Sequence, residues 1–107
     1  MEYISMGAIK AQHQGHFFDR GAMRFFDSRF SRYGVILADG STLFVTSERF
    51  DHNTLRRYTV RMQDATGSIV GVPSDRLASH RVYTFQQYAS SVSAWRALRR
   101  LVRELEQ

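Results

Sequence analysis

Apolar residues recur along the chain with two different periods, and these periods separate predicted helices from predicted strands. The first segment with a helical period is 4–14, which predicts a helix that ends at Gly15. Its apolar residues are Ile4, Met6, Ala8, Ile9 and Ala11. A second short helix is predicted to begin at Asp19, which can cap it. Its apolar face comprises Ala22, Met23, Phe25 and Phe26.

The period changes in the middle of the chain to that of β-strands. The β-rich runs 33–37 and 43–46 flank Asp39-Gly40, a strong hairpin signal because both central positions of a type I′ turn need a positive φ. Residues 57–62 then alternate in the manner of a half-buried strand. One face carries Tyr58, Val60 and Met62, and the other carries Arg57, Thr59 and Arg61.

Two further strands are predicted after this one. The turn sequence 64–67 leads into Ile69, Val70 and Val72, which gives a second hairpin, and Pro73 ends its second strand. Residues 82–85 are a candidate fifth strand.

The last segment is predicted to be an amphipathic helix that begins at Ser90 or Ser91 and lies across one face of the sheet. Its apolar side carries Val92, Trp95, Leu98, Leu101, Val102 and Leu105. Its polar side carries Arg96, Arg99, Arg100 and Arg103. The elements together predict an α+β fold: one or two N-terminal helices, an antiparallel sheet of four to five strands built from hairpins, and a C-terminal amphipathic helix packed on the sheet.

Composition narrows the class of protein. A chain of 107 residues has the usual length of one domain, so we expect a single domain over 1–107. With no Cys, the chain has no disulfide, thiolate or Cys-based zinc chemistry. The first 20 residues contain no apolar run of signal-peptide length, and no stretch reaches the ~18 apolar residues of a membrane-spanning helix. These features predict a cytoplasmic protein that does not enter a membrane.

The charge is strongly basic, with 15 Lys and Arg residues against 10 Asp and Glu and a net charge of +5. Lys10 is the only lysine, so the basic residues are almost all Arg. Codon usage in a GC-rich genome explains that bias, and so does a surface that binds phosphate or carboxylate in bidentate fashion. In either case the charge implies attraction to polyanions or to an acidic protein surface.

Two groups of arginines are candidate contacts for a partner or for nucleic acid. One group, on the strand 57–62 and its approach, is Arg56, Arg57 and Arg61, and the other is the arginine side of the last helix. The predicted order of elements matches that of double-stranded RNA-binding domains, but the Lys-rich helix start and the loop His of those domains are missing. The alternative interpretation is that these arginines simply form a solvated surface.

Metal binding has one candidate motif. His13 and His16, with Asp19 three residues further on, have the spacing of metal ligands on a helix. Gly15 lies inside the motif and breaks the helix that would align the two rings. We therefore expect no metal site.

Catalytic motifs are incomplete throughout. His52 follows Asp51, but no Gly-x-Ser-x-Gly elbow supplies a nucleophile. The segment 67–71 lacks the Lys and the helix of a P-loop, and Glu104-Leu105-Glu106 lacks the upstream segments of an ADP-ribosyl transferase. The prediction is a protein that is not an enzyme and needs no cofactor.

Several aromatic residues are expected to lie in the core. Those predicted to be buried are Phe17, Phe25, Phe44, Tyr58, Phe85 and Trp95. Phe30, Phe50 and Tyr88 are the candidates for exposed aromatics, which would mark an interface with a partner.

Several short motifs resemble a family of small uncharacterised proteins found in phages and mobile elements of high-GC bacteria. The motifs are HFF at 16–18, MRFFDSR at 23–29, FVTSE at 44–48, RRYTVR at 56–61 and FQQYA at 85–89. No activity is attached to that family, so no catalytic residue is carried over.

The resemblance implies a non-enzymatic accessory protein that binds a host protein or ribonucleoprotein complex, in its sharpest form an anti-CRISPR-like inhibitor of a host defence complex. The basic charge argues against mimicry of DNA. An inhibitor of this kind would have to bind an acidic or apolar surface, block a subunit contact, or compete for the nucleic acid itself. The alternative is a nucleic-acid-binding regulator that uses the Arg-rich surface.

Overall fold

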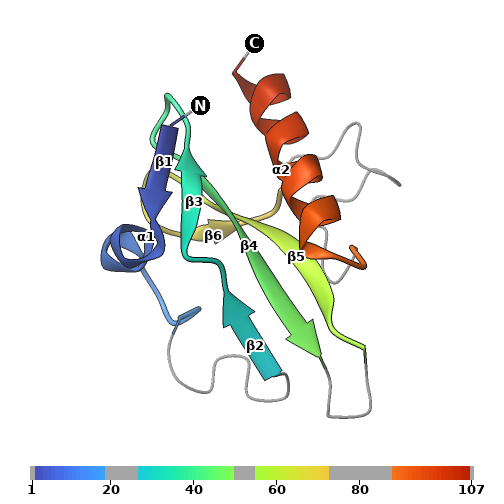
Figure 1. Cartoon of the computed structure of the whole chain (residues 1–107). Helices are drawn as coiled ribbons and strands as arrows, with labels where there is room; N and C mark the ends of the chain where they lie inside the picture. The colour runs from blue at the N-terminus through green and yellow to red at the C-terminus, as the bar shows by residue number, and fades with distance from the viewer. Residues whose placement is uncertain (1, 19–26, 50–54, 73–87, 107) are drawn as a thin grey trace.

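The computed structural model of the chain describes residues 2–18, 27–49, 55–72 and 88–106, which form one antiparallel sheet and two helices (Figure 1). The elements in chain order are β1 (Glu2–Ser5), α1 (Met6–Gln12), β2 (Asp27–Phe30), β3 (Tyr33–Ile36), β4 (Thr42–Arg49), β5 (Arg57–Gln63), β6 (Ile69–Val70) and α2 (Ser91–Leu105). The strands run in the order β1-β3-β4-β5-β6. β4 pairs with β5 along one of its edges. Along its other edge, β4 pairs with β3 near its start and with β2 near its end. The predicted α+β fold, with a hairpin-built sheet and a C-terminal helix, is confirmed.

The N-terminal helix begins later than predicted. Residues 2–5 form β1, where Tyr3 lies opposite Val35 of β3, and α1 starts only at Met6. Ser5 caps α1 by accepting a hydrogen bond from the Ala8 N–H at 3.1 Å. The prediction of helix from residue 4 was wrong because β1 is created by pairing with residues 28 to 34 positions further along, which a local pattern cannot show. The second predicted helix, at 19–26, lies outside the described residues.

Both hairpins are built on the same three-residue turn. In the first, the Leu37 N–H donates to the Ser41 carbonyl at 2.8 Å and the Gly40 N–H donates to the Leu37 carbonyl at 3.0 Å. The central residues are therefore Ala38 and Asp39, followed by Gly40 at φ 90°. This is a type I turn with a left-handed glycine, so the hairpin is confirmed and the type I′ geometry is corrected.

The second hairpin repeats this arrangement between β5 and β6. The Asp64 N–H donates to the Ser68 carbonyl and the Gly67 N–H to the Asp64 carbonyl, at 2.8 and 2.9 Å. Gly67 has φ 91°, and a Cβ there would lie 2.1 Å from the Gln12 carbonyl oxygen. Only glycine fits both conditions. The predicted end of this strand at Pro73 and the candidate strand at 82–85 lie outside the described residues.

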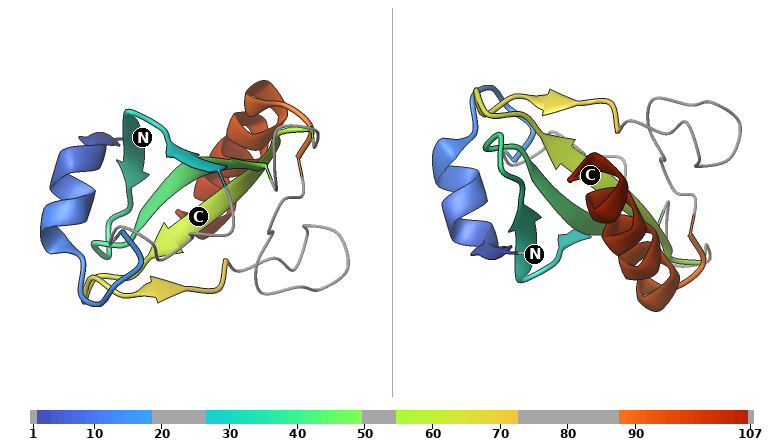
Figure 2. Two further views of the ribbon diagram at one scale, coloured as in Figure 1. Left: turned by 90° about the horizontal axis from the view of Figure 1, so that it is seen from below. Right: turned by 90° about the horizontal axis from the view of Figure 1, so that it is seen from above.

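The sheet has a core on each of its faces, with α1 and α2 on either side of it (Figure 2). The face toward α2 packs Val35, Leu43, Val45, Val60 and Met62 against Ala94, Ala97, Leu98, Leu101 and Val102. The opposite face packs Met6, Ile9 and Phe44 with the partly buried Phe17, Phe18 and Phe30. β5 is therefore not half-buried as predicted: Thr59, on the face expected to meet solvent, is only 1% exposed.

α2 begins as predicted, with Ser90 as the capping residue that accepts a hydrogen bond from the Ser93 N–H at 3.1 Å. Two of its apolar residues do not face the sheet, since Val92 is 59% and Leu105 38% exposed. At 3.6 residues per turn, Val92 lies on the same side as Arg96 and Arg99, so its exposure follows from the helix geometry.

Three of the expected core aromatics are only partly buried. Phe44 is fully buried, whereas Phe17, Tyr58 and Trp95 keep partial exposure at the edges of the two cores. Phe25 and Phe85 lie outside the described residues.

Candidate functional site

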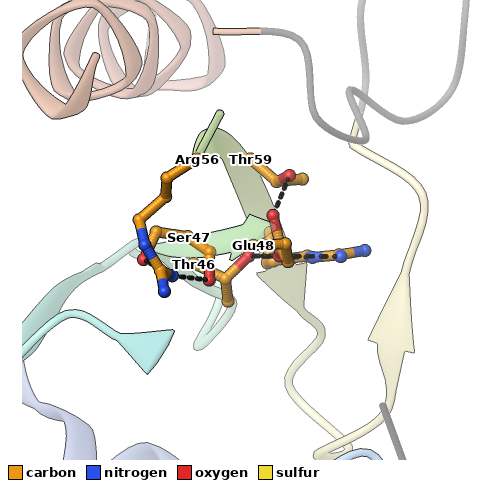
Figure 3. A network of polar contacts seen from close by, with 6 residues as sticks. Thr46, Ser47, Glu48, Arg56 and Thr59 are labelled. Carbon is orange, nitrogen blue, oxygen red and sulfur yellow. Dashed lines mark hydrogen bonds and ion pairs between the residues drawn. The ribbon is translucent and has the colours of Figure 1, made fainter. Parts of the chain in front are cut away.

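The sheet separates the seven arginines that the sequence singled out. Alternation along β5 places Arg57 and Arg61 on the face opposite α2. Arg56 lies on the α2 side, where its Nη1 donates to the carbonyl and the Oγ of Ser47 at 3.0 and 2.9 Å (Figure 3). The remaining four, all exposed, lie on α2: Arg96, Arg99, Arg100 and Arg103. The structure therefore does not join the two predicted groups into one surface.

Arg61 is engaged inside the fold. Its side chain is 15% exposed, and its Nη2 lies 3.3 Å from Oε1 of Glu48, whose side chain is fully buried. Burial lowers the pKa of the Arg61 guanidinium, and the carboxylate of Glu48 partly offsets this effect. The guanidinium also lies over the Phe17 ring, 5.5 Å from its centroid. Arg61 thus serves as the counterion of a buried carboxylate.

Two threonines complete the hydrogen bonding of Glu48 (Figure 3). The Thr59 hydroxyl donates to Oε2 at 2.9 Å, and the Thr46 hydroxyl donates to Oε1. Thr46 and Thr59 lie directly opposite each other on β4 and β5. Glu48 was not predicted as a buried group, because only the register of β4 with β5 brings Thr59 and Arg61 to it.

A second buried polar chain joins α1 to β5. Gln63 Nε2 donates to the Ile9 carbonyl at 3.2 Å, so its Oε1 faces Nδ1 of His13 at 2.9 Å. The Phe17 N–H donates to Nε2 of the same ring at 3.3 Å. Since Nε2 accepts, the proton of the imidazole lies on Nδ1. Both ring nitrogens of His13 are thereby used in holding the fold.

Within the described segments, the candidate metal motif has no further His, Asp or Glu side chain placed to complete a metal site. No group of three or more His, Asp or Glu side chains within them is arranged to hold a metal ion. Asp19 of that motif, and Asp51 and His52, lie outside these segments. Neither described helix is long and apolar enough to cross a membrane.

Two exposed tyrosines and the partly buried Trp95 form a row that was not predicted from the sequence. Tyr3 and Tyr33 are 53% and 44% exposed, and their ring centroids lie 5.2 Å apart, edge to face. Tyr33 lies 5.4 Å from Trp95 of α2, and the guanidinium of Arg99 lies over the Trp95 ring at 5.9 Å. We call Tyr3, Tyr33 and Trp95 the aromatic row.

The residues predicted to be exposed aromatics are in fact packed. Phe30 is partly buried against the Phe44 cluster, and Tyr88 is partly buried against the α2 cluster. Phe50 lies outside the described residues. The aromatic row was missed because no strand was predicted at Tyr3 and because the exposure of Tyr33 depends on where α2 crosses the sheet.

Open pockets lie at both ends of the aromatic row. The first, about 290 Å³, is lined by residues of β2, β4, β5 and the start of α2, among them Phe30, Ser31, Ser47, Tyr58, Ser91 and Trp95. The second, about 400 Å³, lies at the other end of β3 and α2 and is lined by Ile36, Leu37, Val102, Arg103 and the carboxylates Glu2 and Glu106. The first pocket is lined by aromatic and hydroxyl-bearing residues, whereas the second is lined by both acidic and basic residues.

The described fold is that of a small α+β protein whose C-terminal helix presents arginines beside an aromatic row. Residues 4–99 match the family described as Family of unknown function (DUF7447), so the chain belongs to that family. No curated protein and no solved structure matches the chain.

Proposed function

We propose that this protein is a non-enzymatic binding protein that contacts an anionic macromolecule through the arginine side of α2. The observation that supports the proposal is the placement of Arg96, Arg99, Arg100 and Arg103 on the exposed side of one 15-residue helix. The other side of this helix is held in the core by Ala94, Ala97, Leu98, Leu101 and Val102. The arginines are therefore presented on a rigid element.

Helix stability does not explain this arrangement. Arg96 and Arg100 are four residues apart, as are Arg99 and Arg103, and like charges at this spacing destabilise a helix by a few tenths of a kcal/mol, about 0.2–0.5 per pair. An anionic partner would relieve this repulsion. Guanidinium groups form bidentate contacts with phosphate and with carboxylate, so both chemistries suit the surface.

In its specific form, the proposal is that of a phage or mobile-element accessory protein that acts in the cytoplasm of a bacterial host and inhibits a host defence complex in the manner of an anti-CRISPR protein. A net charge of +5 favours partners with an acidic surface or an exposed nucleic acid. Host ribonucleoprotein complexes offer both.

The second candidate function is that of a nucleic-acid-binding regulator. The observation that favours it is the aromatic row directly beside Arg99, because rings next to guanidinium groups can stack on bases while the cations hold phosphates.

Capture of partners from a bacterial host lysate tests the proposal. The tagged protein is compared with the Arg99→Glu/Arg100→Glu double variant, with and without nuclease, and bound material is identified by mass spectrometry. We expect the wild-type protein to retain a discrete host complex that the double variant loses. Arg57→Glu makes the same type of charge change on the other face of the sheet and is the matched control.

Each outcome of the capture experiment separates the alternatives. A host complex that survives nuclease supports a protein contact and the inhibitor. Material that is lost on nuclease treatment supports the regulator. If the double variant is folded and retains everything that the wild-type protein retains, α2 is not the binding surface and the proposal is wrong.

A further inference from the structure

We propose that single-stranded nucleic acid binds along the flank of α2 that faces β3 and β1, with bases against the aromatic row and phosphates against the neighbouring arginines. This inference rests on the proposed function and identifies the chemistry of its anionic partner. Three features of the described residues support it: an uncovered part of the sheet, the order of side chains along α2, and the pocket beside Trp95.

The uncovered part of the sheet is the α2-side face of β1 and of the start of β3. Tyr3 lies opposite Val35 in the register, and Tyr33 is two residues before Val35, so all three side chains share this face. Val35 is fully buried in the α2 cluster, whereas Tyr3 and Tyr33 are about half exposed. α2 packs over β4 and β5, which leaves β1 and β3 beside it (Figure 1). The two tyrosine rings are therefore accessible from solvent.

The side chains of α2 that face this region change in charge along the helix. Trp95, Arg99, Val102 and Glu106 are spaced by four, three and four residues, which places them in one line along the helix. Arg99 lies at the end with Trp95 and Tyr33, whereas Glu106 lines the far pocket together with Glu2. The Trp95 end of this line therefore attracts a polyanion, whereas the far pocket carries two carboxylates beside Arg103 and attracts it less.

The pocket at the Trp95 end offers the groups that a base can use. The residues that line it include the aromatic Tyr58 and Trp95 and the hydroxyl-bearing Ser31, Ser47 and Ser91. Rings provide stacking surface, and hydroxyls both donate and accept hydrogen bonds at base edges. Arg56, which bonds to Ser47, adds a cation beside this wall.

Exposed rings favour a single strand over other polyanions. In a duplex the bases are stacked on one another, so a protein contacts mainly phosphates and groove edges, and the rings of the aromatic row would stay unused. An acidic protein surface would use the arginines and can also pack against aromatic side chains, so the oligonucleotide experiment below distinguishes it from a single strand. A single strand uses both.

Trp95 gives a direct readout because it is the only tryptophan of the chain. The probes are fluorescein-labelled oligothymidylate and oligouridylate of about 15 nucleotides, within the length that single-strand-binding modules cover, and a duplex of the same length. Unlabelled oligothymidylate is used for the titration of Trp95 fluorescence. We expect quenching of Trp95 on addition of the single strand, and tighter binding of at least one single strand than of the duplex in fluorescence anisotropy. The two oligonucleotides distinguish DNA from RNA as the source.

Paired substitutions separate stacking from charge. Tyr3→Leu/Tyr33→Leu removes the rings but keeps apolar side chains, and we expect it to weaken single-strand binding about tenfold or more with an unchanged salt dependence. Tyr3→Phe/Tyr33→Phe keeps the rings and should bind like the wild-type protein. Changing the four α2 arginines to Gln should lower the slope of log K against log salt by about 2 to 3, since each single-strand phosphate contact contributes about 0.7. Arg57→Gln, on the other face, should leave the slope unchanged.

The outcomes distinguish failure of this inference from failure of the proposed function. If the Leu variant is folded by circular dichroism and binds the single strand as tightly as the Phe variant, or if Trp95 fluorescence does not respond, the inference is overturned while a charge-driven role of α2 stands. A nuclease-resistant host protein complex that depends on the α2 arginines, without measurable oligonucleotide binding, also overturns it. If substitution of the α2 arginines changes the binding of no partner, the proposed function itself is overturned.

Discussion

Replacement of Arg61 by Met should strongly destabilise the fold. Arg61 is the cationic partner of Glu48 at 3.3 Å, and the Glu48 side chain is fully buried. Methionine keeps much of the apolar length of arginine but leaves the carboxylate with only the hydroxyls of Thr46 and Thr59. Removing one partner of a buried ion pair costs about 3–5 kcal/mol, because the remaining charge is neither solvated nor neutralised. We expect a loss of this size in the free energy of unfolding.

Urea unfolding followed by circular dichroism measures this loss. A small domain has a total stability of about 5–15 kcal/mol, so the variant should unfold at a much lower urea concentration. Arg57→Met, an exposed residue four positions earlier on the same strand, is the matched control and should change stability by no more than about 0.5 kcal/mol.

A double variant isolates the interaction between the two charges. In Glu48→Gln/Arg61→Met the buried group is neutral and can still bond to the threonine hydroxyls, so the double variant should be more stable than Arg61→Met alone. A loss below about 1 kcal/mol for Arg61→Met, or simple addition of the two single losses, would refute the reasoning that a buried charge is being compensated.

Three further changes test separate parts of the fold by the same unfolding measurements. Gly34→Ala should cost about 1–3 kcal/mol, because its Cβ would lie 2.4 Å from the backbone oxygen of Leu43, which cannot move away as a side chain could; a stability equal to that of the wild type would contradict this close approach. Ser90→Ala removes the cap of α2 and should cost about 1 kcal/mol, whereas Ser90→Asp should restore most of the loss; equal stability of all three proteins would show that the cap contributes nothing. The pKa of Asp64 is lowered by hydrogen bonds from the Thr66 side chain and then from the Ser68 backbone N–H, so its carboxylate stabilises the fold above its ordinary pKa of 3.8, and this contribution is lost as the pH falls through the lowered value. The difference in stability between the wild-type protein and Asp64→Ala should therefore shrink as the pH is lowered from about 5 to about 2, and a difference that is constant over this window would argue against the assigned hydrogen bonds.

Local signals in the sequence accounted for most of the described elements. The turn residues at 39–40 and 64–67 marked both hairpins, because each of these turns needs a glycine in the left-handed conformation. Ser90 and the apolar spacing that follows it marked α2, because a helix is capped and patterned by residues close in sequence. These elements depend on neighbours along the chain, and the structure agrees with their prediction except in the turn type of the first hairpin.

The candidate sites depended on contacts between distant residues, and there the sequence was less informative. The arginines of β5 looked equivalent in the sequence, yet the pairing of β4 with β5 brings Arg61 to a buried carboxylate while Arg57 stays exposed. No element was predicted at Tyr3, and only its pairing with β3 makes it a strand residue.

The sequence by itself determined the α+β class, the hairpins and the arginine side of α2, since these follow from turn chemistry and from the periods of helix and strand. Only the tertiary structure decided which charges are internal and which aromatic rings stay exposed. The physical reason is that burial depends on what packs against a residue. For Glu48 that is the neighbouring strand, and for Tyr33 it is the path of α2, which packs over β4 and β5 and leaves the ring about half exposed.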